Sequence, residues 1–149
     1  MDLQEWLTNQ VKNERAINFN LSDQLSLGEI LEKVKDIINS KESETLKELS
    51  VYFDFEYLFP TDLDSWRGIY AEIALNYTSE GTPLNVVEFK NLIENAIGNT
   101  YEGYKGGDFY MTESTPVWVA NYGRSGNTAV IDIIDDGYQV LIMTAYRNS

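Results

Sequence analysis

Two apolar runs near the end of the chain, joined by an Asp-Gly turn, constrain the fold more than any other feature. Ala129 to Ile134 and Val140 to Met143 are apolar at nearly every position, and Asp135-Asp136-Gly137 lies between them. An Asp-Gly pair flanked by such runs is a strong signal for a β-hairpin. Strands without a polar face are typical of the centre of a sheet that is covered on both sides. The sequence therefore predicts two central hairpin strands, over about 128–134 and 138–146.

Three segments have the periodicity of amphipathic helices and are expected to bury one face each. They span about 2–13, 26–39 and 85–97, and Gly98 is expected to stop the third. The apolar face of the first helix consists of Leu3, Trp6, Leu7 and Val11. The residue pairs that would form capping boxes on the other two are Ser26 with Glu29 and Asn85 with Glu88.

Further strands are expected where apolar and polar residues alternate, over 51–57, 69–77, 108–112 and 117–121. Residues 58–65 and 99–107 are expected to be irregular loops, and such loops often carry function. The sum predicts one α+β domain over residues 1–149, with residues 1–25 forming an N-terminal helix and linker as an appendage. Its core is expected to be a mostly antiparallel sheet of five to six strands with about three helices packed on it.

The composition excludes several classes of function. Twenty-four acidic residues face eleven basic ones, and the net charge is -13, which repels nucleic acid and anionic membranes. The chain contains neither cysteine nor histidine, so it lacks the usual zinc ligands and the commonest general base. No apolar run is long enough to span a membrane. We therefore expect no enzyme activity, no metal, no cofactor, no direct binding of nucleic acid and no membrane association.

The few cations in the second half of the chain have an unusual setting. Three of the five, Arg67, Lys105 and Arg124, lie in glycine-rich stretches beside aromatic residues. Glycine amides can face an anion, and cations beside aromatic rings suit a planar, phosphorylated molecule. The pattern predicts a ligand site formed by Trp66, Arg67, Tyr104, Lys105, Gly106, Gly107, Trp118, Asn121, Tyr122 and Arg124.

Each part of this site also has a purely structural interpretation, which the sequence leaves open. Arg67 could pair with Asp62 or Asp64 and so hold its loop, since local carboxylates are plentiful. The glycine-rich stretch around Lys105 could be a simple connection or a β-bulge. Trp118 could lie in the core, with Arg124 at the tip of a hairpin.

Carboxylate pairs are the remaining candidates for chemistry. Asp54 and Glu56 would be neighbours on one face of the strand expected over 51–57. Such a pair can perform acid–base chemistry or bind a divalent ion, but a solvated strand face explains it more simply. Asp135 and Asp136 are best explained as turn residues.

The stretch from Tyr52 to Tyr146 resembles small acidic proteins encoded by bacteriophages, prophages and related mobile elements. The blocks that carry the resemblance are 65–70 (SWRGIY), 103–109 (GYKGGDF) and 115–123 (TPVWVANYG). The resemblance implies a phage origin and action in the cytoplasm of a host bacterium. It carries over no catalytic residues.

Two functions follow as expectations from the residues and the resemblance together. The first is a counter-defence protein that binds and sequesters a small anionic, nucleotide-derived ligand, in a pocket of the kind that often lies at the interface of a homo-oligomer. The alternative is an acidic inhibitor that mimics DNA and blocks a host defence protein. Its surface would be the acidic stretch 42–56 together with Asp62 and Asp64.

Overall fold

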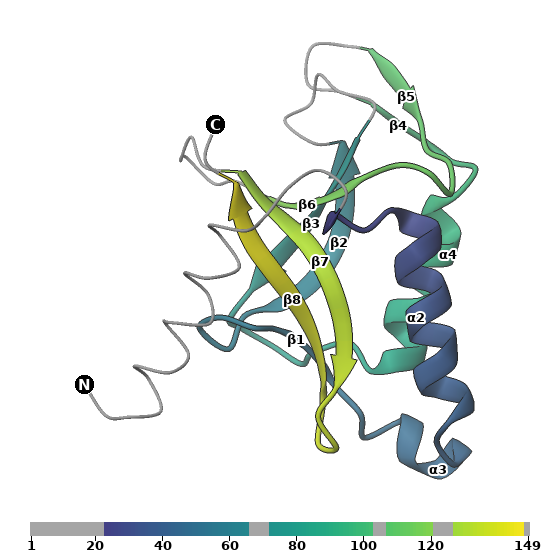
Figure 1. The fold of residues 1–149 in the computed structure, drawn as a ribbon, viewed down its shortest axis with the longest axis vertical. Helices are drawn as coiled ribbons and strands as arrows, with labels where there is room; N and C mark the ends of the chain where they lie inside the picture. The colour runs from purple at the N-terminus through teal and green to yellow at the C-terminus, as the bar shows by residue number, and fades with distance from the viewer. Residues whose placement is uncertain (1–22, 66–71, 103–106, 121–126, 148–149) are drawn as a thin grey trace.

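The computed structural model describes residues 23–65, 72–102, 107–120 and 127–147 (Figure 1). These residues form three helices and eight strands, which confirms the α+β class. The helices are α2 (Leu27–Asn39), α3 (Ser43–Leu46) and α4 (Val86–Ala96). The strands are β1 (Val51–Phe53), β2 (Phe59–Ser65), β3 (Ile73–Thr78), β4 (Thr100–Glu102), β5 (Asp108–Tyr110), β6 (Val117–Val119), β7 (Asn127–Asp135) and β8 (Val140–Arg147). The helix expected at about 2–13 lies outside the described residues.

Six strands form one mixed sheet in the order β1-β8-β7-β6-β3-β2, and β4 pairs with β5 in a separate two-stranded sheet. β7 and β8 pair antiparallel in the interior of the sheet, which confirms the hairpin and its central position. However, β1 is parallel to β8 and β3 is parallel to β6, so the sheet is mixed rather than antiparallel, with three antiparallel pairings and two parallel ones. Parallel partners require a long crossover, and α4 lies in the connection from β3 to β6. The alternation of apolar and polar residues within one strand does not reveal which distant strand it pairs with.

β2 is a strand where the sequence predicted an irregular loop. Pro60 and the nearby aspartates favoured a turn, because proline cannot donate a ladder hydrogen bond. β2 lies at the edge of the sheet and pairs only with β3, so the missing N–H is tolerated there. The register shifts between Pro60 and Leu63, as in a β-bulge. The strand expected over 69–77 accordingly begins, within the described residues, only at Ile73.

β1 ends at Phe53, earlier than expected, because the chain turns sharply after it. Glu56 and Tyr57 have φ angles of 51° and 54°, and the N–H of Leu58 donates to the carbonyl of Phe55 at 3.3 Å. Both features are those of a type I′ turn. The turn returns β2 towards β1, and the N–H of Phe53 donates to the carbonyl of Leu58 at 2.8 Å. The two edges of the sheet therefore meet through this turn.

Replacing Tyr57 with glycine is expected to raise the free energy of unfolding by about 1 kcal/mol, because a left-handed backbone strains every residue with a Cβ. The Tyr57 side chain is 86% exposed, so its removal costs little packing. Tyr57→Ala is the matched control, since it removes the same ring but keeps the Cβ. Urea denaturation of the three proteins measures the difference. Equal stability of the glycine and alanine variants would contradict a strained turn.

α2 and α4 pack side by side on one face of the sheet (Figure 1). Both capping boxes are confirmed: the side chains of Ser26 and Asn85 accept hydrogen bonds from the N–H groups of Glu29 and Glu88, whose carboxylates bond back. Gly98 has a φ of 87° just after α4, as expected of a residue that ends a helix. The helical residues buried in the core are Leu27, Ile30, Val34, Val86, Phe89, Ile93 and Ala96. None of the helices in the described ranges is long and apolar enough to cross a membrane.

The residues just before α2 join the sheet directly. The N–H of Leu25 donates to the carbonyl of Val130 at 2.8 Å, and the carbonyl of Leu25 accepts from the N–H of Val117 at 3.1 Å. The side-chain amide of Gln24 also donates to the carbonyl of Val117, at 2.9 Å. Leu25 is buried in the main core, although the sequence assigned it to a linker. The chain therefore passes between β6 and β7 before it enters α2.

Candidate functional site

Most of the residues predicted to bind a ligand lie outside the described parts of the chain. These are Trp66, Arg67, Tyr104, Lys105, Gly106, Asn121, Tyr122 and Arg124. Gly107 and Trp118 are described. The structure therefore bears on this site through Gly107, Trp118 and the elements that border the three cation-bearing segments.

Trp118 is packed within the sheet rather than presented to solvent. It is 3% exposed, and it lies in one cross-strand row between Ala74 of β3 and Ala129 of β7. Ala120 and Ile131 pack against the same cluster. This position fits the structural interpretation that the sequence left open, in which Trp118 supports the fold.

Gly107 is exposed and immediately precedes β5 in the hairpin that β5 forms with β4. A Cβ at this position would lie 3.3 Å from the ring of Phe109, so even alanine would crowd that ring. The strand expected over 108–112 is the short β5, and Thr100–Glu102 forms β4 within a stretch expected to be irregular. The glycine-rich stretch 103–107 thus connects two paired strands.

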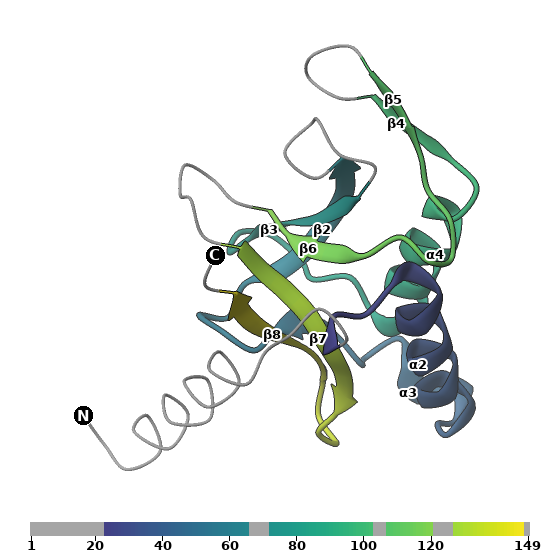
Figure 2. The same ribbon diagram turned by 45° about the horizontal axis from the view of Figure 1, so that its top comes forward.

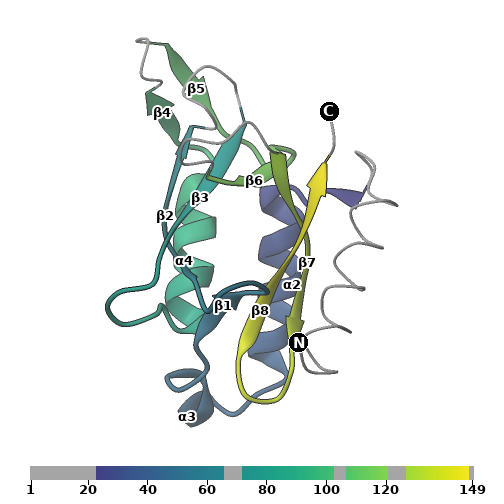
Figure 3. The same cartoon turned by 90° about the vertical axis from the view of Figure 1, so that its left-hand side faces the viewer.

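The elements that border the three cation-bearing segments lie at the same end of the molecule. Residues 66–71 follow β2 and precede β3, residues 103–106 join β4 to β5, and residues 121–126 lie between β6 and β7. In Figures 2 and 3, the corresponding ends of these strands lie on the upper side of the molecule, and Figure 3 shows α3 at the opposite end. Strands far apart in the sequence thus bring the borders of all three segments to one side.

Two of these borders are also connected electrostatically. Burial and then the negative charges of Asp64 and Asp62 raise the pKa of the Tyr101 phenol above its ordinary value. The end of β2 and the β4–β5 hairpin are therefore close enough to influence each other's charge states. The Asp62 carboxylate is itself held in place, because it accepts hydrogen bonds from Thr61 at 2.9 Å and from Asn76 at 3.1 Å. A cation in either neighbouring segment would meet a negative potential here.

The carboxylate pairs raised by the sequence have structural roles in the described residues. The Asp54 carboxylate accepts from the Thr144 N–H at 3.0 Å and the Thr144 hydroxyl at 2.7 Å. Glu56 lies in the type I′ turn beyond β1, so the two do not share a strand face as expected. Asp136 accepts from two backbone N–H groups after it, and Gly137 has a φ of 94°, which confirms the turn assignment.

Three described lysines are engaged by carboxylates. Lys33 lies 3.2 Å from Asp132, Lys41 lies 2.6 Å from Asp135, and Lys90 lies 3.6 Å from Glu94. The hydrogen bond from Lys41, followed by one from the Gly137 N–H, lowers the pKa of the Asp135 carboxyl. These cations are therefore occupied with intramolecular partners.

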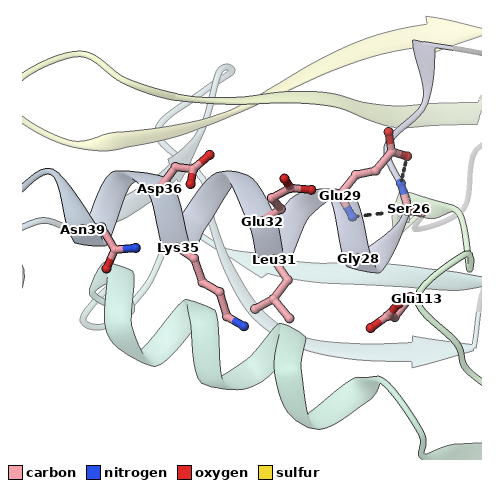
Figure 4. A pocket seen from close by; sticks show the side chains of 9 residues that line it. All are labelled: Ser26, Gly28, Glu29, Leu31, Glu32, Lys35, Asp36, Asn39 and Glu113. Atoms are coloured by element: carbon pink, nitrogen blue, oxygen red, sulfur yellow. Dashed lines mark hydrogen bonds between the residues drawn. The ribbon is translucent and has the colours of Figure 1, made fainter.

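A groove of about 560 Å³ runs along the exposed side of α2 (Figure 4). Its described lining consists of Ser26, Gly28, Glu29, Leu31, Glu32, Lys35, Asp36, Asn39 and Glu113. Four carboxylates and one ammonium make it negative, so it suits a cationic group and not a phosphate. The spacing of Glu29, Glu32 and Asp36 on one helical face was visible in the sequence, but the approach of Glu113 was not.

In the described ranges, no three carboxylates gather closely enough to hold a metal ion. Comparison of this chain with known protein families, characterised proteins and solved structures finds no match. The resemblance to phage-encoded proteins stays a prediction from the sequence.

Proposed function

We propose that this protein binds and sequesters a small anionic ligand derived from a nucleotide, at the end of the molecule where β2, β3, β6, β7 and the β4–β5 hairpin present their connections. Arg67, Lys105 and Arg124 neutralise the phosphates, and Trp66, Tyr104 and Tyr122 stack on the base. Asn121 hydrogen-bonds the base edge or the sugar, and the amides of Gly106 and Gly107 contact phosphate oxygens. Trp118 does not contact the ligand in this proposal; it stabilises β6, the strand that precedes residues 121–126.

The observation that carries the proposal is the common position of the three borders. The strand ends that border these segments lie on one side of the molecule, which supports a shared site for their three cations and three rings (Figures 2 and 3). Lys33, Lys41 and Lys90 are paired elsewhere with carboxylates. The glycine-flanked cations lie beside aromatic residues in the sequence, which suits them to such a ligand.

The biological setting of this proposal comes from the resemblance stated above. A phage-encoded protein that hides a nucleotide signal in the host cytoplasm would act against a defence pathway without any catalytic step. Such a protein needs tight binding and no reaction, which agrees with a chain that lacks histidine and cysteine. The three segments could also meet those of a second copy, which makes a homo-oligomer part of the proposal.

Alanine at Arg67, Lys105 or Arg124 is expected to raise the Kd for the ligand about tenfold to a hundredfold, because a charge-assisted hydrogen bond contributes about 1.5–3 kcal/mol. The ligand is first sought by thermal shift against a panel of cyclic and linear nucleotides, with inorganic phosphate as the simplest anion. Isothermal titration then measures the Kd of each variant.

Lys90→Ala is the matched control, because Lys90 is a cation of the same half of the chain that pairs with Glu94 on α4. Its Kd is expected to stay within about twofold of the natural protein, since it contributes only a screened, distant charge. No stabilisation by any nucleotide at micromolar concentration would contradict the proposal. Equal losses from Lys90 and the three glycine-flanked cations would contradict the assigned site.

The acidic groove on α2 favours a second candidate, an inhibitor that blocks a basic cleft of a host defence protein (Figure 4). The acidic surface expected from the sequence comprises residues 42–56 together with Asp62 and Asp64. These residues do not form one patch, because α3 lies at one end of the molecule and the end of β2 lies at the other (Figure 3). Asp54 is also occupied with Thr144. Glu29, Glu32, Asp36 and Glu113 offer a more compact acidic surface.

Native mass spectrometry of the protein purified from bacterial cells distinguishes the two candidates. Sequestration predicts a co-purified small molecule with a mass of a nucleotide. The inhibitor predicts a protein partner whose binding weakens steeply as salt is raised, because exposed charges are screened. The same measurement reports the number of copies in the assembly.

A further inference from the structure

The sheet has a second apolar face, on the side away from α2 and α4. Val140 and Ile142 of β8 lie in the core beneath the helices, so the alternation of a strand places Leu141, Met143 and Ala145 on the other side. Ala145 is opposite Ala129 in the register, and Ala129 belongs to the separate cluster around Trp118. This outer face, defined by Trp118, Ala129, Leu141, Met143 and Ala145, is largely apolar across three neighbouring strands, although Asp132 of β7 is opposite Met143 in the register.

The described apolar residues that pack with Trp118 lie beside it in the sheet. Ala74 and Ala129 occupy the adjacent strands of the same row, and Ala120 and Ile131 also come from the sheet or its margin. Both long helices of the described chain pack against the opposite face (Figures 1 and 3). Trp118, Ala129 and Ala145 are only 3%, 0% and 4% exposed, so this part of the face is shielded from water. The outer face therefore requires a cover with an apolar stripe.

Residues 2–13 have the stripe that such a cover needs. Leu3, Trp6, Leu7 and Val11 share one side of a helix, while Glu5 and Asn9 lie on the opposite side. A twelve-residue helix is about 18 Å long, which is about two thirds of the length of the nine-residue β7 and the eight-residue β8. An isolated helix of this length is marginal in water, so it gains its stability by packing.

The place where the described chain begins also supports residues 2–13 as the segment that covers the outer face. Gln24 and Leu25 are bonded to Val117 and Val130, next to Trp118 and Ala129 in β6 and β7. The preceding residues therefore leave directly from the sheet. The nine residues 14–22 can span at most about 30 Å, which is enough to lead a helix across the outer face.

We propose that residues 2–13 form an amphipathic helix that packs its Leu3, Trp6, Leu7 and Val11 side against the outer face of the sheet in the same chain. The sheet is then covered on both sides, by α2 and α4 on one and by the N-terminal segment on the other. This inference concerns the cover of the sheet and does not depend on the proposed ligand.

The absence of natural cysteine makes a cross-linking test clean, since both attachment points are then defined. Met143→Cys is combined with Leu3→Cys, Leu7→Cys or Val11→Cys, and with Glu5→Cys or Asn9→Cys as controls from the opposite side of the helix. Each full-length variant is treated at low concentration with a bismaleimide of about 10 Å reach, and the products are identified by mass. Thermal unfolding of each variant first confirms that it is folded.

An intramolecular link at the monomer mass, formed at least about fivefold faster from positions 3, 7 and 11 than from positions 5 and 9, is the expected result. Equal rates from both sides of the helix, or no link from any position, would overturn the proposal. A link found only between two chains would overturn it as well, because the cover would then be supplied by a second copy.

Discussion

Replacing Trp118 with alanine is expected to lower the free energy of unfolding by about 3–5 kcal/mol, a loss typical of removing a buried large aromatic side chain. The indole is 3% exposed and fills the row between Ala74 and Ala129. Those small neighbours cannot expand into the space that the ring vacates, so a cavity would remain. Urea denaturation, with a check that the slope is unchanged, measures the loss.

Tyr138→Ala is the matched control for Trp118, because it removes an aromatic ring that is 89% exposed in the β7–β8 turn. Its effect is expected to stay within about 0.5 kcal/mol. This pair of variants also separates two roles of Trp118. A ring that only stacked on a ligand would weaken binding and leave stability nearly unchanged, and that outcome would contradict its position in the fold.

Gly28→Ala is expected to lower the free energy of unfolding by about 1–3 kcal/mol, although alanine normally stabilises a helix relative to glycine. Gly28 lies in the first turn of α2, where its N–H donates to the Glu113 carbonyl at 2.9 Å. A Cβ on Gly28 would lie 3.0 Å from both that carbonyl oxygen and the Glu113 Cβ. The neighbouring atoms are backbone or next to it, so they cannot rotate away.

The control for Gly28 is Glu32→Ala, an exposed position in the same helix that faces the same groove. It is expected to be neutral or slightly stabilising, because alanine is the better helix former and little packing is lost. Thermal and urea unfolding report both variants. A stabilising effect of Gly28→Ala would show that the 112–115 turn can move away from the helix and that the close approach is not required.

The local elements of this protein follow from short stretches of sequence. Ser26 with Glu29 and Asn85 with Glu88 predicted both described long helices, because a capping box and an apolar stripe involve residues within one or two turns. The β7–β8 hairpin was predicted for the same reason, since its turn and its register are set by neighbouring residues. These predictions needed no knowledge of the rest of the chain.

The predictions that failed depended on distant partners. Pro60 is compatible with β2 only because β2 is an edge strand, and the end of β1 depends on a type I′ turn formed without asparagine or glycine. The candidate site has the same limit. The sequence identified three cations in glycine-rich settings, but it could not decide between the core and the ligand site for Trp118 or bring Glu113 to α2.

By itself the sequence determined the α+β class, the capped helices, the central hairpin and the scarcity of cations, because each is set by composition or by neighbours in the chain. The tertiary structure alone decided the mixed strand order, the meeting of β1 with β2 and the common end at which three cation-bearing segments start and finish. Those features arise when residues far apart in sequence bury a shared apolar surface, and the free energy of that burial depends on all the partners together.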